Sequence, residues 1–182
     1  MNVIKDNKLQ IVIFLLVIIL GIVAALTVKR AKNNSSAENI ADKVVTVNQP
    51  LPEINFVDYK DKASYNQELK QGRVLLIYIM TSCGGCQMEA DIIAQSNLAK
   101  DSRIRIFAIA NEDSNSLAGF SKNHSFEFSI FSDENDVFRK GLNITHFPTN
   151  FLINNGIIEK RWVGSPRNAE ELYKKLEIPE MK

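Results

Sequence analysis

The segment 73–80, RVLLIYIM, limits the fold more than any other part of the sequence. It is almost wholly apolar, as expected for a strand buried on both faces of a sheet. The chain's only two cysteines follow at once, in the polar turn TSCGGC at 81–86. Residues 86–100 contain no proline or glycine, which favours a helix that begins within the cysteine motif, with Thr81 or Ser82 as its N-cap. The sequence therefore predicts a strand, a cysteine turn and a helix in direct succession.

From about residue 47 onward, apolar runs alternate with helical patterns, which is typical of a sheet built from crossover units. Further strands are predicted at 54–57, 103–110, 129–131, 150–153 and 157–163. Further helices are predicted at 64–70, 114–123, 134–140 (closed by Gly141) and 169–176, and a hairpin turn at 154–156. We therefore expect an α/β domain over residues 47–182.

The apolar residues near the N-terminus form an uncharged run of 18 at 11–28, about the length of a membrane span. The sequence KRAK at 29–32 follows the run, which favours an uncleaved anchor over a removed signal peptide. We therefore predict a short cytoplasmic tail (1–8), a transmembrane helix (9–28) and a polar linker (29–46). Basic residues flank both ends of the run, so charge alone barely sets its orientation. We expect the globular domain to be exported.

The charge balance of the chain argues against one class of partner. Lysine and arginine total 22 and the acidic residues total 21, a formal net charge of +1. A nucleic-acid-binding protein usually carries a basic excess, because phosphate contacts dominate its affinity. Nucleic acid is therefore not an expected partner.

The Cys83–Cys86 pair has three chemical interpretations. A disulfide across so short a loop constrains the unfolded chain little, which weakens a purely structural role. A zinc site needs four ligands, and the remaining soft candidates, His124 and His146, do not form a second tight pair. A thiol at a helix N-terminus is instead stabilised as the thiolate, the form that attacks disulfides. Cys86, one turn along, can then resolve the mixed disulfide. The spacing favours a redox pair, with no metal and no cofactor beyond the Cys83–Cys86 disulfide itself.

Several motifs together resemble the thioredoxin-like proteins, and within them the membrane-anchored TlpA/ResA-like thiol-disulfide oxidoreductases. The resemblance covers residues 51–176. It is carried by the Cys-x-x-Cys motif, by FSIFSD and the segment after it at 128–144, and by HFPTNFLI at 146–153. It implies a thioredoxin-like fold with a central mixed β-sheet flanked by helices.

The resemblance also implies roles for individual residues. Pro148 would follow a cis peptide bond and pack beside Cys83, while the backbone of Phe147 would bind an extended partner peptide. Independently of the resemblance, Gly84 and Gly85 remove side-chain bulk over the thiols, and we expect them to belong to the substrate-binding surface. Glu89 lies three residues after the second cysteine, the offset at which these relatives carry a glutamate that handles protons. Its other interpretation is an ordinary solvated helix glutamate.

The chain also departs from the family pattern. Ser82 stands where a tryptophan is common, and Ile77 stands where thioredoxins carry a buried aspartate. The glycine pair supplies neither the proline nor the charge often found between the cysteines, which leaves the redox potential open. Trp162 is expected to pack in the core. His146 lies close enough in sequence to Pro148 to approach the site, although an ordinary loop position is the favoured interpretation.

The expected function is dithiol–disulfide exchange with exported protein partners, most simply as a reductant, for example in cytochrome c maturation. The absence of a histidine between Cys83 and Cys86 is compatible with that direction. The protein would sit in the inner (cytoplasmic) membrane with its domain on the periplasmic side, and would take electrons from a transmembrane donor. Two alternatives stay open: a disulfide oxidase or isomerase, and a thioredoxin-fold copper chaperone that uses the cysteines with a distant histidine.

Overall fold

The computed structural model describes residues 16, 18–22, 45–53, 57–60, 64, 66–124 and 128–179. The chain divides into two units, residues 1–40 and 41–182. Within the described ranges, no helix is long and apolar enough to cross a membrane. The predicted tail (1–8) lies outside the described residues, as do most of the predicted transmembrane helix (9–28), apart from 16 and 18–22, and the predicted linker (29–46), apart from 45–46. The predicted strand at 54–57 also lies outside them, except for its last residue.

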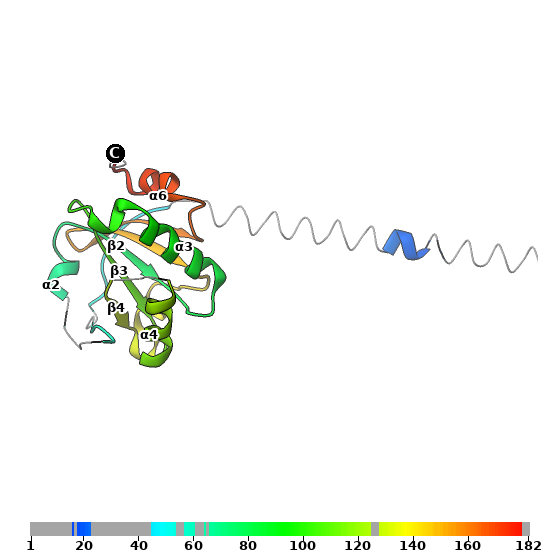
Figure 1. The fold of residues 1–182 in the computed structure, drawn as a ribbon, viewed down its shortest axis with the longest axis horizontal. Coiled ribbons are helices and arrows are strands. Elements are labelled where there is room, and N and C mark those ends of the chain that lie inside the picture. The colour runs from blue at the N-terminus through cyan, green and yellow to red at the C-terminus, as the bar shows by residue number, and fades with distance from the viewer. Residues whose placement is uncertain are drawn as a thin grey trace, which may run out of the picture. The chain divides into compact units, whose positions relative to one another are not determined.

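Six strands of the second unit form one mixed sheet (Figure 1). They are β1 (Val45–Pro50), β2 (Arg73–Tyr78), β3 (Arg105–Ala110), β4 (Ile130–Ser132), β5 (Thr149–Asn154) and β6 (Ile157–Val163). Their order across the sheet is β1-β6-β5-β2-β3-β4. Strand β3 runs parallel to β2 and β4, whereas β5 pairs antiparallel with β2 and β6, and β1 pairs antiparallel with β6. The expected mixed sheet is confirmed.

Strand β2 is buried on both faces of the sheet, and its alternate residues point to opposite sides. The helices are α2 (Asn66–Leu69), α3 (Gly84–Gln95), α4 (Ser114–Asn123), α5 (Val137–Gly141) and α6 (Ala169–Leu176). Leu75 and Ile77 belong to a core shared with α3, α4 and α6, while Leu76 and Tyr78 belong to a core shared with α2 and α5. The cysteine motif therefore joins β2 to the first of these two layers.

Three expected boundaries were wrong, each because a contact decides the local structure. Strand β1 begins at Val45, inside the predicted linker, where it pairs with Arg161 of β6. The N-cap of α3 is Cys83, since the Thr81 hydroxyl donates to Glu112. A short 3₁₀ turn, Asn97–Lys100, separates from α3 because the chain is extended at Ser96.

The helix predicted at 134–140 is also divided in two. Asn135 and Asp136 have positive φ, which separates a 3₁₀ turn, Glu134–Asp136, from α5. Gly141 is the last residue of α5, whose C-cap is Leu142.

Candidate active site

The two cysteines lie at the start of α3 in unequal environments. Cys83 is the N-cap and is partly exposed, whereas Cys86 is only 1% exposed and belongs to the core. The Met80 carbonyl accepts from the Cys83 amide at 3.0 Å, so the turn is closed by its own backbone. Both side chains are free thiols in this structure. The outer sulfur is thus available to a partner, and the inner one is not.

The burial of Cys86 controls its protonation. Removal from water raises the pKa of its thiol well above the ordinary value, and the nearby Cys83 and Glu89 raise it further. The backbone N–H of Met80 donates to Cys86 Sγ at 3.4 Å and works in the opposite direction. The effect of burial on the pKa is larger than that of the Met80 bond, so Cys86 carries its proton at neutral pH. A reaction through Cys86 therefore needs a group that accepts that proton.

The loop before β5 comes directly against Cys83. The Phe147–Pro148 peptide bond is cis, which confirms that prediction. The Cys83 thiol donates to the Phe147 carbonyl oxygen at an Sγ–O distance of 3.5 Å. The loop and the outer thiol therefore form one surface, as expected, while the binding of a partner peptide to Phe147 and Pro148 stays a prediction.

The two glycines of the motif differ in the space around them, which the sequence pattern does not indicate. A Cβ added at Gly85 would lie 3.2 Å from Pro148 Cδ and 3.8 Å from Cys83 Sγ. A Cβ added at Gly84 would meet nothing within 4 Å. Gly85 thus permits the close approach of the Pro148 loop, and Gly84 is open. Their predicted contact with a partner stays a prediction.

Glu89 is buried on the inner face of α3, which excludes the solvated interpretation. It is 1% exposed, and its one hydrogen bond in the described structure comes from Asn150 Nδ2 to Oε2 at 3.3 Å, leaving Oε1 without a partner. Burial raises the pKa of Glu89 to about 8, against the lowering effects of the Asn150 amide and the Lys175 charge. A carboxyl with this pKa exchanges protons near neutral pH.

Two polar residues of the site were not singled out from the sequence. Asn150 lies in β5 and contacts Glu89, and Glu112 follows β3 and fixes the cysteine turn. The Glu112 carboxylate accepts from the Thr81 amide at 2.7 Å and from the Thr81 hydroxyl at 2.8 Å. Two sequence signals were available: Asn150 lies in an apolar strand, and Glu112 comes just after another strand. Neither signal identifies a partner by itself.

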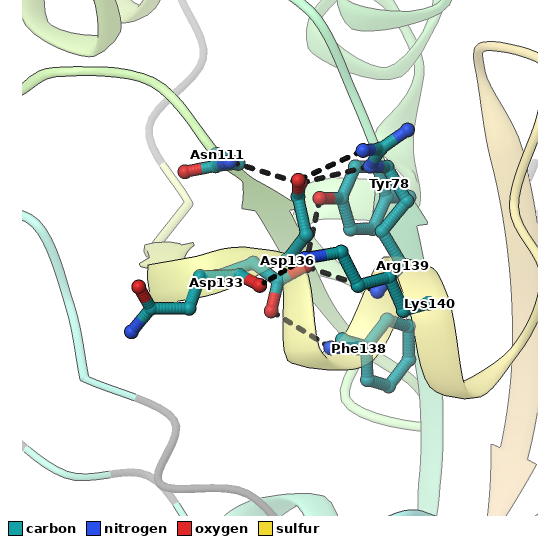
Figure 2. Close-up of polar contacts among 8 residues, drawn as sticks. Tyr78, Asn111, Asp133, Asp136, Phe138, Arg139 and Lys140 are labelled. Atoms are coloured by element: carbon teal, nitrogen blue, oxygen red, sulfur yellow. Dashed lines mark hydrogen bonds and ion pairs between the residues drawn. The ribbon is translucent and has the colours of Figure 1, made fainter.

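A second polar cluster contains Tyr78, Asn111, Asp133, Asp136 and Arg139 (Figure 2). The Tyr78 ring packs on Phe147 of the site. Asp133 accepts from the Tyr78 hydroxyl at 2.8 Å and from the amides of Phe138 and Arg139 at 2.8 and 3.0 Å. Arg139 also forms a two-bond ion pair with Asp136. A hollow of about 260 Å³ adjoins the cluster and is lined by Tyr78, Ile79, Met80, Asn111, Glu112, Asp136, Arg139 and Phe147. The cluster thus holds Tyr78 in place, and the Tyr78 ring packs on Phe147 of the Pro148 loop.

The remaining predicted residues have local partners. Trp162 is buried in the core, which confirms its packing role. His124 Nδ1 lies 2.9 Å from Asp91 Oδ1, and His146 Nδ1 lies 2.9 Å from Thr145 Oγ1. In the part of the chain that the structure describes, no three His, Cys, Asp or Glu side chains are grouped so that they could hold a metal ion.

The fold and the site together define a thioredoxin-like protein with a thiol pair at a helix N-terminus. Residues 47–161 match the AhpC/TSA family model, and the chain belongs to that family. No curated protein matches the chain.

Solved structures share the fold at low sequence identity. StoA from Bacillus subtilis is 20% identical, with a TM-score of 0.57 over 68% of this chain and 98% of that chain. A thioredoxin-family thiol:disulfide interchange protein from Chlorobium tepidum is 20% identical, with a TM-score of 0.60 over 73% and 97%. The thioredoxin domain of a Bacteroides vulgatus thiol-disulfide oxidoreductase is 18% identical, with a TM-score of 0.59 over 73% and 96%. These structures confirm the thioredoxin-like fold. The family match supports the expected enzyme class, thiol-disulfide oxidoreductase.

Proposed function

We propose that this protein is a membrane-anchored thiol-disulfide oxidoreductase that reduces disulfide bonds in exported protein partners. The observation that carries the proposal is the unequal cysteine pair beside the cis proline. Cys83 is partly exposed against the Phe147 carbonyl, and Cys86 is buried one helical turn behind it. An outer attacking thiol with an inner resolving thiol is the arrangement that two-step disulfide exchange requires.

The reaction balances over two steps. The Cys83 thiolate attacks one sulfur of the partner disulfide, which forms a mixed disulfide and releases the other partner sulfur as a thiolate. Cys86 then loses its proton and attacks Cys83 Sγ, which releases the second partner sulfur. The partner gains two electrons and ends as a dithiol, and this protein ends with a Cys83–Cys86 disulfide. A dithiol donor must reduce that disulfide before the next cycle.

Glu89 supplies the proton acceptor that the second step needs. Its side chain lies one helical turn after Cys86, and the charge of its carboxylate raises the pKa of the Cys86 thiol. With a pKa of about 8, Glu89 is part ionised near neutral pH and can take the Cys86 proton as the thiolate forms. The same carboxyl can return a proton when the pair is reduced again.

The direction and the location are part of the proposal. No histidine lies between the cysteines to stabilise a thiolate and strengthen an oxidant, which supports a reductant. The apolar stretch 11–28 supports an anchor in the cytoplasmic membrane, with the domain on the periplasmic side and a transmembrane electron donor. Apocytochrome c, whose thiols must be reduced before haem attachment, is a partner of the expected kind.

Trapping a partner tests the exchange. In the full chain, Cys86→Ala should accumulate a mixed disulfide through Cys83, while Cys83→Ala, the matched control, should accumulate none. Loss of bound copper in Cys86→Ala without any trapped partner would instead support a metal carrier. The reduction potential of the wild-type pair then tests direction. A value near roughly −270 mV is expected for a reductant, and a value near roughly −120 mV would indicate an oxidant.

A further inference from the structure

Asn150 occupies an unusual place for an asparagine. It lies within β5, with Ile77 of β2 on one side and Trp162 of β6 on the other, and it is 0% exposed. Asparagine is depleted in strands, and burying its amide costs free energy unless the amide is hydrogen-bonded. The side chain must therefore be held there by specific polar contacts.

Those contacts join two parts of the site. Asn150 Nδ2 donates to Glu89 Oε2 on α3 and to the Gly164 carbonyl after β6, each at 3.3 Å. The Gly164 amide in turn donates to the Pro148 carbonyl at 2.8 Å. One amide group thus connects the buried acid on α3 to the loop that faces Cys83.

We propose that Asn150 is a positioning residue for thiol exchange, because its amide holds the Glu89 carboxyl at the inner cysteine and ties it to the Pro148 loop. This inference rests on the proposed function, since it concerns the acid assigned to the second step. It adds a residue on a different strand, outside the Cys-x-x-Cys motif and its helix.

An amide suits this place because it can meet both forms of the acid. Its N–H group donates to a Glu89 carboxyl oxygen in the structure, a contact that favours the carboxylate, and its oxygen can accept from the protonated carboxyl. Asn150 Oδ1 and Glu89 Oε1 are both buried and have no hydrogen-bond partner in the described structure. A leucine would offer neither contact. Asn150 can therefore keep Glu89 in place while its proton comes and goes.

Few other charged or titratable groups lie near Glu89 in the described structure, and none of them is altered by a substitution at Asn150. On α3 the neighbour is Cys86, whose thiol interacts with the Glu89 charge. On α6 it is Lys175, which forms an ion pair with Glu171 at 3.2 Å. A substitution at Asn150 leaves all three in the chain. A change in Glu89 titration in such a variant is therefore assigned to the lost amide.

The direct test follows the Glu89 carboxyl by ¹³C NMR across a pH titration of the reduced full chain in detergent. Asn150→Leu removes the donor to the carboxylate, so the pKa of Glu89 should rise by about one pH unit. Asn150→Ser, smaller and unable to reach Glu89, should give the same rise if the leucine variant does not fold. Thr149→Val is the control, because it removes a buried bond to the His146 carbonyl from the other face of β5. An unchanged Glu89 pKa in the folded Asn150 variant would overturn the proposal.

The kinetic test separates positioning from general support of the fold. The pH dependence of mixed-disulfide resolution should move upward in Asn150→Leu by the same amount as the Glu89 titration. In a Glu89→Gln background, the Asn150 substitution should produce no further shift. A uniform loss of rate with an unmoved pH profile would show a structural role only and would overturn the proposal. Absence of exchange in the wild type would instead refute the proposed function, and the NMR titration would still decide the Asn150–Glu89 interaction.

Discussion

Asp133 and Glu89 are two buried carboxyl groups that differ in their hydrogen bonds. Asp133 is 2% exposed and accepts three, from the Tyr78 hydroxyl and from two backbone amides at the start of α5. Glu89 is equally buried but accepts one in the described structure, at 3.3 Å, and one of its oxygens has none. The difference lies in how many donors the surrounding backbone provides.

This contrast shows that burial alone does not prepare a carboxyl for chemistry. The three donors tie the Asp133 carboxyl to β2 and to the start of α5, so it links two elements of the fold. A buried carboxyl with few donors holds its proton to a higher pH, as the pKa of about 8 for Glu89 shows. Asp133 is therefore suited to fixing structure, and Glu89 to exchanging a proton.

The largest expected effect comes from removing the well-bonded carboxyl. Asp133→Ala leaves the buried Tyr78 hydroxyl, the buried Phe138 amide and the part-buried Arg139 amide without their acceptor, so the free energy of unfolding at pH 7 should fall by more than about 3 kcal/mol. Asp113→Ala is the control, because Asp113 also accepts backbone amides but does so at the exposed start of α4. It should cost about 1 kcal/mol. If urea unfolding showed equal losses of unfolding free energy for the two variants, the distinct structural role assigned to Asp133 would be wrong.

The next effect is a pH dependence that belongs to Glu89. Folding raises its pKa from 4.5 to about 8, so the folded state binds the proton more tightly. The stabilisation is fully present below about pH 4.5 and is lost as the pH rises toward 8. Relative to Glu89→Gln, wild-type stability should therefore fall by on the order of 3 kcal/mol between pH 5 and 8. Parallel stability curves for the two proteins would show that Glu89 is not buried as described.

The smallest effect sharpens the description of Asp133. Tyr78→Phe removes one donor of three while keeping the ring that packs on Phe138 and Phe147. The free energy of unfolding should fall by about 1 kcal/mol, since Asp133 retains two amide donors. In an Asp133→Ala background, the same substitution should cost clearly less, because the acceptor is already gone. Full additivity would mean that the hydroxyl does not act through Asp133.

Local pattern was enough to predict most of the fold. The apolar run at 73–80, the hairpin turn at Asn155 and Gly156, and helices α4 and α6 were all visible in the sequence, because each depends on residues close together in the chain. Strand β1 was missed because it is specified by pairing with Arg161 and its neighbours, more than a hundred residues away. The first residues of α3 were misplaced for a similar reason, since Glu112 holds Thr81 from another loop.

The sequence predicted only those site residues that belong to a recognisable motif. Cys83, Cys86, Pro148 and Glu89 carry recognisable spacing, and the structure shows the cis bond at Pro148 and the burial of Glu89. Asn150 carries no such spacing. Its role depends on which α3 residue faces the start of β5, and the packing of the helix on the sheet sets that register.

The unequal space around the two glycines has a consequence for anyone who would redesign this protein. A side chain at position 85 would lie 3.2 Å from the Pro148 ring, so the ring would have to shift by a few tenths of an ångström, whereas one at position 84 would extend into open space. Substitutions at position 84 are therefore expected to leave the loop in place, whereas each substitution at position 85 requires the Pro148 ring to shift. A library that varies both positions together would place nearly all of its members outside the small subset that keeps glycine at position 85.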